Sequence, residues 1–142
     1  MNEGNELYLK RLKHLVQFEI NVVPDIKNTK NMPVDELKTK EGLALLKQVG
    51  DGDKLCLLDE NGTTFTSEKF ADFIDKLTTT GTKQLIFVVG GAYGFSQEVY
   101  GRADYKISLS KMTFSHQIIR VIFLEQIYRA YTIIKGIPYH NQ

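Results

Sequence analysis

Two almost wholly apolar runs restrict most strongly how this chain folds: DKLCLLD, residues 53–59, and KQLIFVV, residues 83–89. A strand that is apolar along its length is buried on both faces, as in a parallel sheet covered by helices. The segment between the runs carries four apolar residues with the spacing of an amphipathic helix: Phe70, Phe73, Ile74 and Leu77. This strand, helix, strand order predicts an α/β fold with a mostly parallel sheet flanked by helices.

The remaining elements follow from apolar periodicity and from cap and turn residues. They are a helix over residues 7–15, a half-buried strand over 17–23, a helix from Pro33 to Val49, a helix capped by Ser67, a short helix capped by Ser96, a short strand over 106–110 and a long helix over 118–134. ENG, residues 60–62, is a turn signal after the first apolar strand. With 142 residues, of which 42% are hydrophobic, we expect a single domain over residues 1–142.

Charge and cysteine content narrow the class of protein. The net charge of +1 gives no field strong enough to indicate a nucleic-acid partner by itself. The single cysteine, Cys56, lies in an apolar run, which favours a buried thiol in a reducing compartment and provides no metal cluster. The amino terminus shows no signal-peptide pattern, and no run approaches the roughly 18 apolar residues of a membrane span. We therefore expect a cytoplasmic protein without a membrane partner.

Three loops are placed to bind a ligand, because ligands of parallel α/β sheets bind beyond the carboxyl ends of the strands. They are LLDENG, GGAYGF and SLSKMTFSH, at residues 57–62, 90–95 and 108–116. Glycines in the second loop would let the backbone approach a ligand without a Cβ in between. The simpler explanation of the same glycines is a tight strand-to-helix turn. The loop matches neither G-x-G-x-x-G nor a P-loop, which counts against dinucleotide and triphosphate ligands.

The helix expected over residues 118–134 is apolar on nearly all sides and must therefore be covered on two of them. One cover is the sheet, and the other is either the rest of the domain or a second copy in a two-fold dimer. We expect the dimer, because few other elements remain. Arg120, Glu125 and Arg129 interrupt this surface, and charges there are costly unless they are paired or used. An ion pair between Glu125 and Arg129, four residues apart, is the simplest pairing.

Several segments together closely resemble the ribosomal RNA large subunit methyltransferase H family, the small stand-alone SPOUT methyltransferases: LLDENG, FVVGGAYGF, ISLSKMTFSHQIIRVIFLEQIYRAYTI and the terminal PYH. The resemblance covers about residues 7–140, including KEG at residues 40–42. It implies an enzyme that uses S-adenosylmethionine to methylate N3 of a pseudouridine in 23S ribosomal RNA, as a homodimer on assembled ribosomes. It also implies a SPOUT-like fold with a carboxy-terminal trefoil knot, a rare exception to unknotted topology.

The resemblance further implies which residues form the site. Those expected to bind the cofactor are Leu58, Gly91, Ser110, Lys111, Met112, Thr113, Phe114 and Ser115. Those expected to place the substrate and manage its charge are Arg129, Tyr139 and His140, with the tail reaching across the dimer. Without the family, core packing is the simpler role for Leu58 and Met112. A frayed chain end is the simpler state for Tyr139 and His140.

Contacts with RNA would come from local basic patches, for which the candidates are Lys10, Arg11, Lys13, Lys27, Lys30, Arg102, Lys106 and Lys111. An ordinary solvated side chain is the alternative for each of them. His14 is either solvated or an RNA contact. His116 is as consistent with orienting the last helix as with a catalytic role.

One departure from the family concerns the amino terminus, where the chain begins at the first helix and lacks the strand and turn that precede it in family members. A missing strand would leave a sheet edge exposed. Two other functions stay open. One is a non-enzymatic ribosome-binding module that keeps the knot, which the retained loop and tail residues argue against. The other is a SPOUT methyltransferase acting on transfer RNA, which the lack of an added RNA-binding domain argues against.

Overall fold

The computed structural model describes residues 2–23, 26–90 and 93–139. In these parts the elements follow in the order α1 (Asn2–Lys13), α2 (Val34–Leu46), β1 (Lys54–Thr64), α3 (Ser67–Thr79), β2 (Leu85–Val89), α4 (Gln97–Arg102), β3 (Tyr105–Ser108) and α5 (His116–Lys135). The strands form one parallel sheet in the order β2-β1-β3. The predicted α/β fold with a parallel sheet is confirmed, and the trefoil knot stays a prediction.

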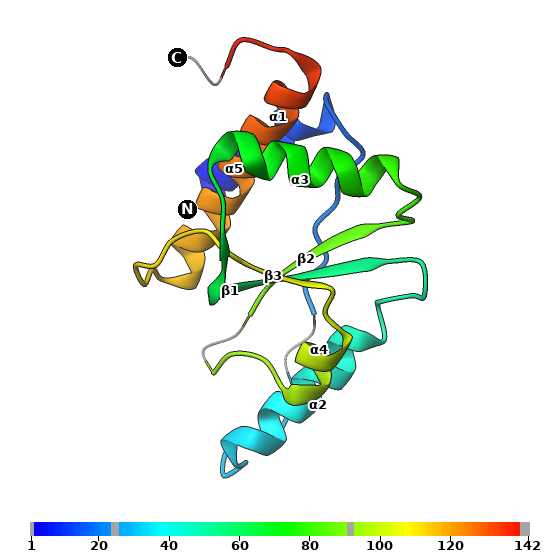
Figure 1. Ribbon diagram of the computed structural model, residues 1–142. Helices are drawn as coiled ribbons and strands as arrows, with labels where there is room; N and C mark the ends of the chain where they lie inside the picture. Colours follow the sequence, from blue (N-terminus) through cyan, green and yellow to red (C-terminus); the bar gives the residue numbers. More distant parts are fainter. Residues whose placement is uncertain (1, 24–25, 91–92, 140–142) are drawn as a thin grey trace.

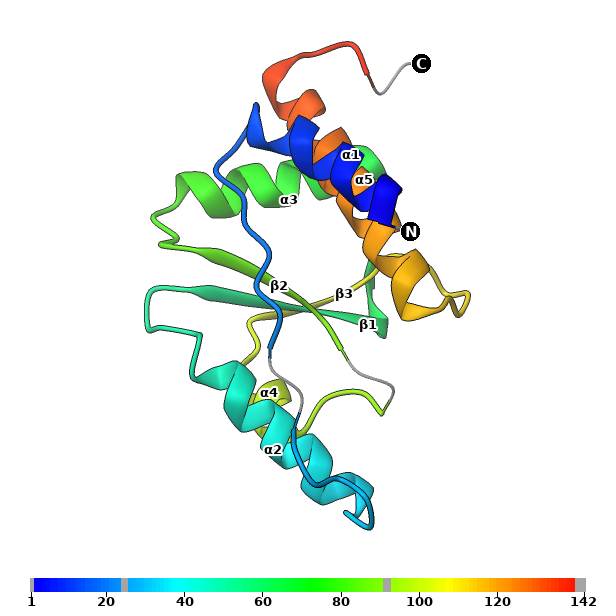
Figure 2. The ribbon, with the colours of Figure 1, turned by 180° about the vertical axis from the view of Figure 1, so that it is seen from behind.

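Helices cover both faces of this sheet. α1, α3 and α5 pack together on one face, and α2 packs with α4 on the other, as the two opposite views show (Figures 1 and 2). The side chains of β1 alternate between two cores: Cys56 joins the larger core with Ile127, and Leu55 and Leu57 join the smaller core with Val99. Because both faces of β1 are buried over residues 55–57, this part of the strand is wholly apolar, which is what predicted a parallel sheet.

Cys56 is fully buried in the larger core. Burial, with a smaller contribution from the nearby carboxylate of Asp104, raises the pKa of the thiol to about 12. The thiol is therefore protonated at neutral pH and unreactive, which confirms the prediction of a buried thiol.

α5 is covered within the chain along much of its length. Phe123, Leu124, Ile127 and Ala130 are buried, and the helix contacts both α1 and α3. Packing within the same domain, the alternative to a dimer, therefore explains how these apolar residues of α5 are buried. Ile118, near the amino end, remains exposed. The dimer stays a prediction, and it concerns this exposed end of α5.

Residues 17–23, expected to be a strand, pair with no other segment in the described part of the chain. Their alternating pattern is typical of a half-buried strand, yet Ile20 and Val22 are 52% and 82% exposed. A strand needs a hydrogen-bonded neighbour, and alternation along one segment carries no information about that neighbour. The prediction of a strand is therefore wrong for this structure.

The turn expected at residues 60–62 is an irregular part of β1 instead. Leu58 and Thr63 both lie opposite Ile107, so the register shifts between them. Gly62 permits this arrangement, because a Cβ at this position would lie 2.6 Å from the backbone nitrogen of Ile107. The predicted turn residues thus interrupt the regular pairing of β1 with β3, and the pairing resumes at Thr63.

The cap of α3 lies one residue before the predicted one. Thr66 accepts a hydrogen bond from the backbone N–H of Lys69 at 3.2 Å. Ser67 instead donates from its hydroxyl to Oε1 of Gln126 at 2.9 Å and so ties the start of α3 to α5. The predicted cap was therefore wrong by one position, because two adjacent hydroxyl residues offer the same local signal.

Candidate functional site

The carboxyl ends of the three strands meet at one edge of the sheet. Leu58 of β1 pairs with Val89 of β2 and with Ile107 of β3, so the three predicted loops leave the sheet at the same level. Leu58 is half-buried and packs against the larger core. Core packing therefore accounts for part of its surface, and its register places it at the base of the first loop.

The second loop is shaped by Phe95. A Cβ on Gly90 would lie 2.8 Å from Cζ of Phe95, whose ring is buried, so glycine is needed for this close approach. Gly94 has a φ of 81°, a conformation that glycine adopts without strain. Ser96 then caps α4 with its side chain, as predicted. Gly91, the glycine predicted to bind the cofactor, lies outside the described residues.

The third loop is tied down at its base and exposed at its tip. The hydroxyl of Ser108 donates to the carbonyl of Ser110, and the hydroxyl oxygen of Ser110 accepts from the backbone N–H of Met112. Met112 is 73% exposed and Phe114 is also exposed, so core packing is wrong for Met112. Ser115 caps α5 by accepting a hydrogen bond from the backbone of its first turn. The loop therefore presents apolar side chains to solvent beside the strand ends.

The first loop contacts α4 and the third loop. Asp59 accepts a hydrogen bond from the hydroxyl of Tyr100 at 2.5 Å, and Glu60 accepts a long one from Thr113 at 3.5 Å. Lys111 is exposed next to this contact. The sequence analysis did not single out Asp59 or Tyr100, because their meeting depends on how α4 packs across the end of β1.

A second group of predicted residues lies near the carboxyl end of α5. Nη2 of Arg129 lies 2.6 Å from Oε1 of Glu125, which confirms the predicted ion pair, and the two side chains are 22% and 19% exposed. The guanidinium carbon of Arg129 lies 5.1 Å from the ring centroid of Tyr139, whose hydroxyl donates to the same oxygen of Glu125 at 3.4 Å. The rings of Tyr128 and Tyr139 meet edge-on at 4.8 Å. His140, the third predicted catalytic residue, lies outside the described residues.

These contacts hold both groups of the tail cluster, Arg129 and Tyr139, in defined protonation states. The hydrogen bond to Glu125 raises the pKa of Arg129, so the guanidinium remains charged. Burial and a hydrogen bond with Tyr8 raise the pKa of Tyr139 to about 12, so its hydroxyl is a neutral donor at neutral pH. A frayed chain end is therefore wrong for Tyr139. Tyr8 was missed in the sequence because α1 meets the tail only in the folded chain.

α5 keeps the loops and the tail cluster apart within one chain. At 1.5 Å of rise per residue, Arg129 lies about 20 Å along the helix from Ser115. Figure 1 shows α5 leading away from the third loop toward the carboxyl terminus. The structure therefore brings Leu58 and residues 110–115 together at one edge, but it does not bring them to Arg129 or Tyr139. His116 is exposed at the loop end of the same helix, where Ser115 provides the cap.

Comparison with known proteins identifies the family. The family described as "Predicted SPOUT methyltransferase" matches residues 1–140. The chain belongs to this family. It is 55% identical over 137 residues to a "Ribosomal RNA large subunit methyltransferase H" of Christiangramia forsetii, covering 96% of this chain and 87% of the relative. A protein of the same name from Parabacteroides distasonis is 56% identical over 135 residues, covering 95% of this chain and 86% of the relative. The resemblance seen in the sequence is confirmed.

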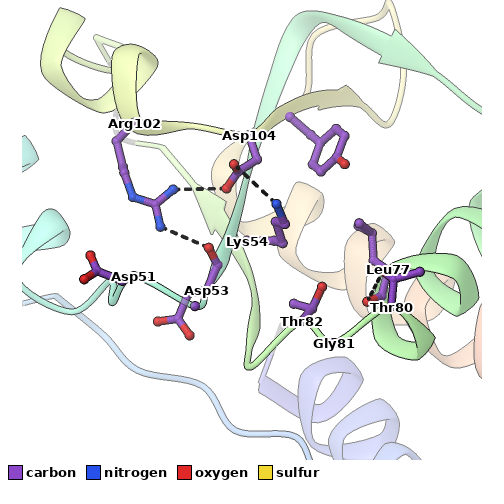
Figure 3. A pocket seen from close by; sticks show the side chains of 11 residues that line it. Asp51, Asp53, Lys54, Leu77, Thr80, Gly81, Thr82, Arg102 and Asp104 are labelled. Carbon is purple, nitrogen blue, oxygen red and sulfur yellow. Dashed lines mark hydrogen bonds and ion pairs between the residues drawn. The ribbon is translucent and has the colours of Figure 1, made fainter.

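This SPOUT methyltransferase has a hollow of about 550 Å³ at the opposite edge of the sheet, where the strands begin (Figure 3). There Arg102 donates to the carbonyls of Gly50 and Asp53 and pairs with Asp104 at 3.0 Å. Lys54 faces the same carboxylate at 4.0 Å. These charged groups pair with one another, and together they connect the start of β1 to the segment that precedes β3. Arg102 is held by these contacts, and its contact with RNA stays a prediction.

The other predicted RNA contacts remain exposed, and phosphate binding stays a prediction for them: Lys10, Arg11, Lys13, Lys27, Lys30, Lys106 and Lys111. Arg11 also lies over the ring of Tyr128 at 5.8 Å, and His14 is exposed just beyond α1. Within the described ranges of this SPOUT methyltransferase, no helix is long and apolar enough to cross a membrane. Among the same residues, no three His, Cys, Asp or Glu side chains are grouped to hold a metal ion.

Proposed function

We propose that this protein transfers the methyl group of S-adenosylmethionine to N3 of a pseudouridine in 23S ribosomal RNA, as a cytoplasmic homodimer that acts on assembled ribosomes. Family membership supports the reaction class, and the names of the relatives support a large-subunit ribosomal RNA substrate. The observation that carries the proposal is the placement of a loop edge suited to a methyl donor and a charged tail cluster on the same chain. The modified atom follows from the family resemblance.

The loop edge fits S-adenosylmethionine in the chemistry of its residues. The exposed side chain of Met112 and the half-buried side chain of Leu58 offer apolar contacts for an adenine ring. Gly91, the glycine predicted to bind the cofactor, follows Gly90 directly in the sequence. We infer that residues 110–115 close over the adenosine. When bound, the cofactor supplies a methyl group already activated on a sulfonium.

The residues of the tail cluster hold the acceptor and manage its charge. The imide N–H of a uracil-like base is weakly acidic, so transfer needs the proton removed and the resulting negative charge stabilised. Arg129 is a fixed cation because Glu125 holds its guanidinium, and Tyr139 is a neutral hydrogen-bond donor. We infer that these two groups orient the base and stabilise its charge. His140 follows directly in the chain and is the candidate to accept the imide proton.

A second copy of the chain completes the site. Since α5 separates the two groups by about 20 Å, one chain does not present both to the same base. A two-fold dimer places the tail cluster of each protomer against the loops of the other if the two α5 helices pack antiparallel, with the loop end of one beside the tail end of the other. The exposed side chains of Phe114 and Ile118 at that edge support burial by a partner.

The test combines cofactor binding with methyl transfer to three substrates. Calorimetric titration with S-adenosylmethionine is expected to show binding. Transfer of radiolabelled methyl groups is expected to assembled ribosomes, and much less to free ribosomal RNA or to transfer RNA. Failure to bind the cofactor would favour a non-enzymatic ribosome-binding module, and transfer to transfer RNA would favour a different substrate class. Mapping the labelled nucleotide then tests the pseudouridine N3 assignment.

A further inference from the structure

Asp59 and Tyr100 connect the first loop to α4. The hydroxyl of Tyr100 donates to Oδ2 of Asp59 at 2.5 Å, directly after the last regularly paired residue of β1. Oδ1 of the same carboxylate accepts a hydrogen bond from the backbone N–H of Asn61 at 2.9 Å. Both oxygens of Asp59 are therefore held, one by its own loop and one by the neighbouring helix.

Phe95 extends this connection to the second loop. The ring of Tyr100 meets the ring of Phe95 edge-on, with 5.8 Å between centroids. The ring of Phe95 in turn lies against Gly90, where a Cβ would be only 2.8 Å from it. A continuous series of contacts thus runs from the carboxylate of the first loop, through Tyr100 and Phe95, to the backbone of the glycine loop. Tyr100 therefore contacts both the carboxylate of the first loop and the ring that lies against the second loop.

Electrostatics favour this hydrogen bond at neutral pH. Burial alone would raise the pKa of Asp59, but the hydrogen bonds from Tyr100 and Asn61 and the nearby charge of Lys106 lower it overall. Burial, together with the bond to Asp59, raises the pKa of Tyr100 to about 12. The bond therefore joins a neutral phenol to a carboxylate, which is the stronger, charge-assisted kind.

We propose that Tyr100 and Asp59 are positioning residues that fix the spacing of the first two loops and thereby set the affinity for the methyl donor. This inference rests on the proposed function, because it needs these loops to bind S-adenosylmethionine. Tyr100 is 38% exposed, so its hydroxyl is not needed to fill the core. Its contacts serve the relative position of two loops at the strand ends.

Tyr100→Phe tests this directly, because it removes the hydroxyl and keeps the ring against Phe95. We expect the dissociation constant and the KM for S-adenosylmethionine to rise about tenfold, the effect of losing one hydrogen bond to a charged group. The kcat at saturating cofactor and the KM for ribosomes are expected to stay near their wild-type values. Asp59→Asn keeps an acceptor for Tyr100 but loses the charge, so its effect is expected to be smaller.

Tyr105→Phe is the matched control, because Tyr105 is 37% exposed and lies at the amino end of β3, away from these loops. It is expected to leave cofactor affinity unchanged. If the wild-type protein binds S-adenosylmethionine and Tyr100→Phe binds it equally well, the inference is overturned and the proposed function stands. An equal rise in the KM for ribosomes would also overturn it, since the hydroxyl would then act on the whole site and not on the cofactor loops. If the wild-type protein does not bind, the proposed function fails, and the inference with it.

Discussion

The two ends of α5 are built in opposite ways. At its amino end, the third loop carries the exposed apolar side chains of Met112 and Phe114, and one long hydrogen bond from Thr113 reaches the first loop. Near its carboxyl end, Arg129 and Tyr139 are held by an ion pair, a hydrogen bond and ring contacts. The amino end of α5 therefore presents exposed apolar side chains, and the carboxyl end presents a charged group held in place.

This difference indicates a division of labour within the proposed reaction. Exposed apolar groups gain most when a ligand covers them, so the loop end is suited to close on a bound cofactor. Groups that stabilise developing charge act best when their positions are set before the reaction, as they are in the tail cluster. We therefore expect changes at the loop end to alter affinity for the cofactor, and changes at the tail end to alter the rate of transfer.

Arg129→Ala should have the largest effect. Removing the fixed cation is expected to lower kcat by a factor of about 100 to 1,000, as for loss of one preorganised charge-stabilising group. Affinity for S-adenosylmethionine, measured by calorimetry, is expected to stay within about twofold, since the residue lies far along α5 from the loops. Lys47→Ala is the control, because Lys47 is an exposed cation that follows α2 on the other face of the sheet, and kcat is expected to stay unchanged. A normal kcat in Arg129→Ala would remove the tail cluster from the reaction.

Gly90→Ala should act on the loop end. The added Cβ would collide with Phe95 at 2.8 Å, so we expect stability to fall by about 1 to 3 kcal/mol and cofactor affinity to fall at least as much as in Tyr100→Phe. Chemical denaturation and calorimetry measure the two effects. Gly101→Ala is the matched control, since nothing lies within 4 Å of a Cβ there. It is expected to stabilise α4 slightly, as alanine favours a helix. Unchanged binding in Gly90→Ala would contradict the role of this loop.

The sequence predicted well those features that repeat along one segment. The apolar run around Cys56 predicted the buried part of β1, and the spacing of Phe70, Ile74 and Leu77 predicted α3, because each pattern reports its own burial. The run around Phe87 predicted the strand β2, but this edge strand is only partly buried along its length. Features that depend on a distant partner were not predictable in this way. The alternating residues near Ile20 predicted a strand, but in the described part of the chain no other segment pairs with them.

The candidate site shows the same limit. The family resemblance predicted Leu58, the third loop and the tail residues as site residues. Leu58 and the third loop do lie at one edge of the sheet, and their roles stay predictions. Arg102 looked like any other surface arginine, and only the fold places it among the carbonyls of Gly50 and Asp53. The contact of Tyr100 with Asp59 likewise joins residues far apart in the sequence, so neither local spacing nor charge indicated it.

Met112→Ala should sharpen the contrast with a smaller effect. Because the side chain is largely exposed, we expect stability to change by no more than about 0.5 kcal/mol. Cofactor affinity is nonetheless expected to fall severalfold, roughly the loss of one partly buried apolar contact. Leu43→Ala, at an exposed leucine of α2, is expected to change neither quantity. Equal affinity in Met112→Ala and the wild-type protein would place the adenosine elsewhere.

The smallest effect concerns alkaline pH. The folded-state pKa of Tyr139 is raised from 10.0 to about 12, so its contribution to stability is present below pH 10 and is lost as pH rises toward 12. Thermal unfolding of the wild-type protein is expected to shift downward over that range, and less so in Tyr139→Phe. The same slope in both proteins would show that Tyr139 is not held as described.

The shared site is tested most directly by mixing two inactive variants. Gly90→Val disables the loop end and Arg129→Ala disables the tail end, so each homodimer alone should be inactive while remaining folded by circular dichroism. In a mixed dimer, one site combines the intact loops of one protomer with the intact tail of the other. An equal mixture that exchanges subunits freely should therefore recover about a quarter of wild-type methyl transfer to ribosomes. If native mass spectrometry shows mixed dimers and activity stays at background, the site does not lie between two protomers.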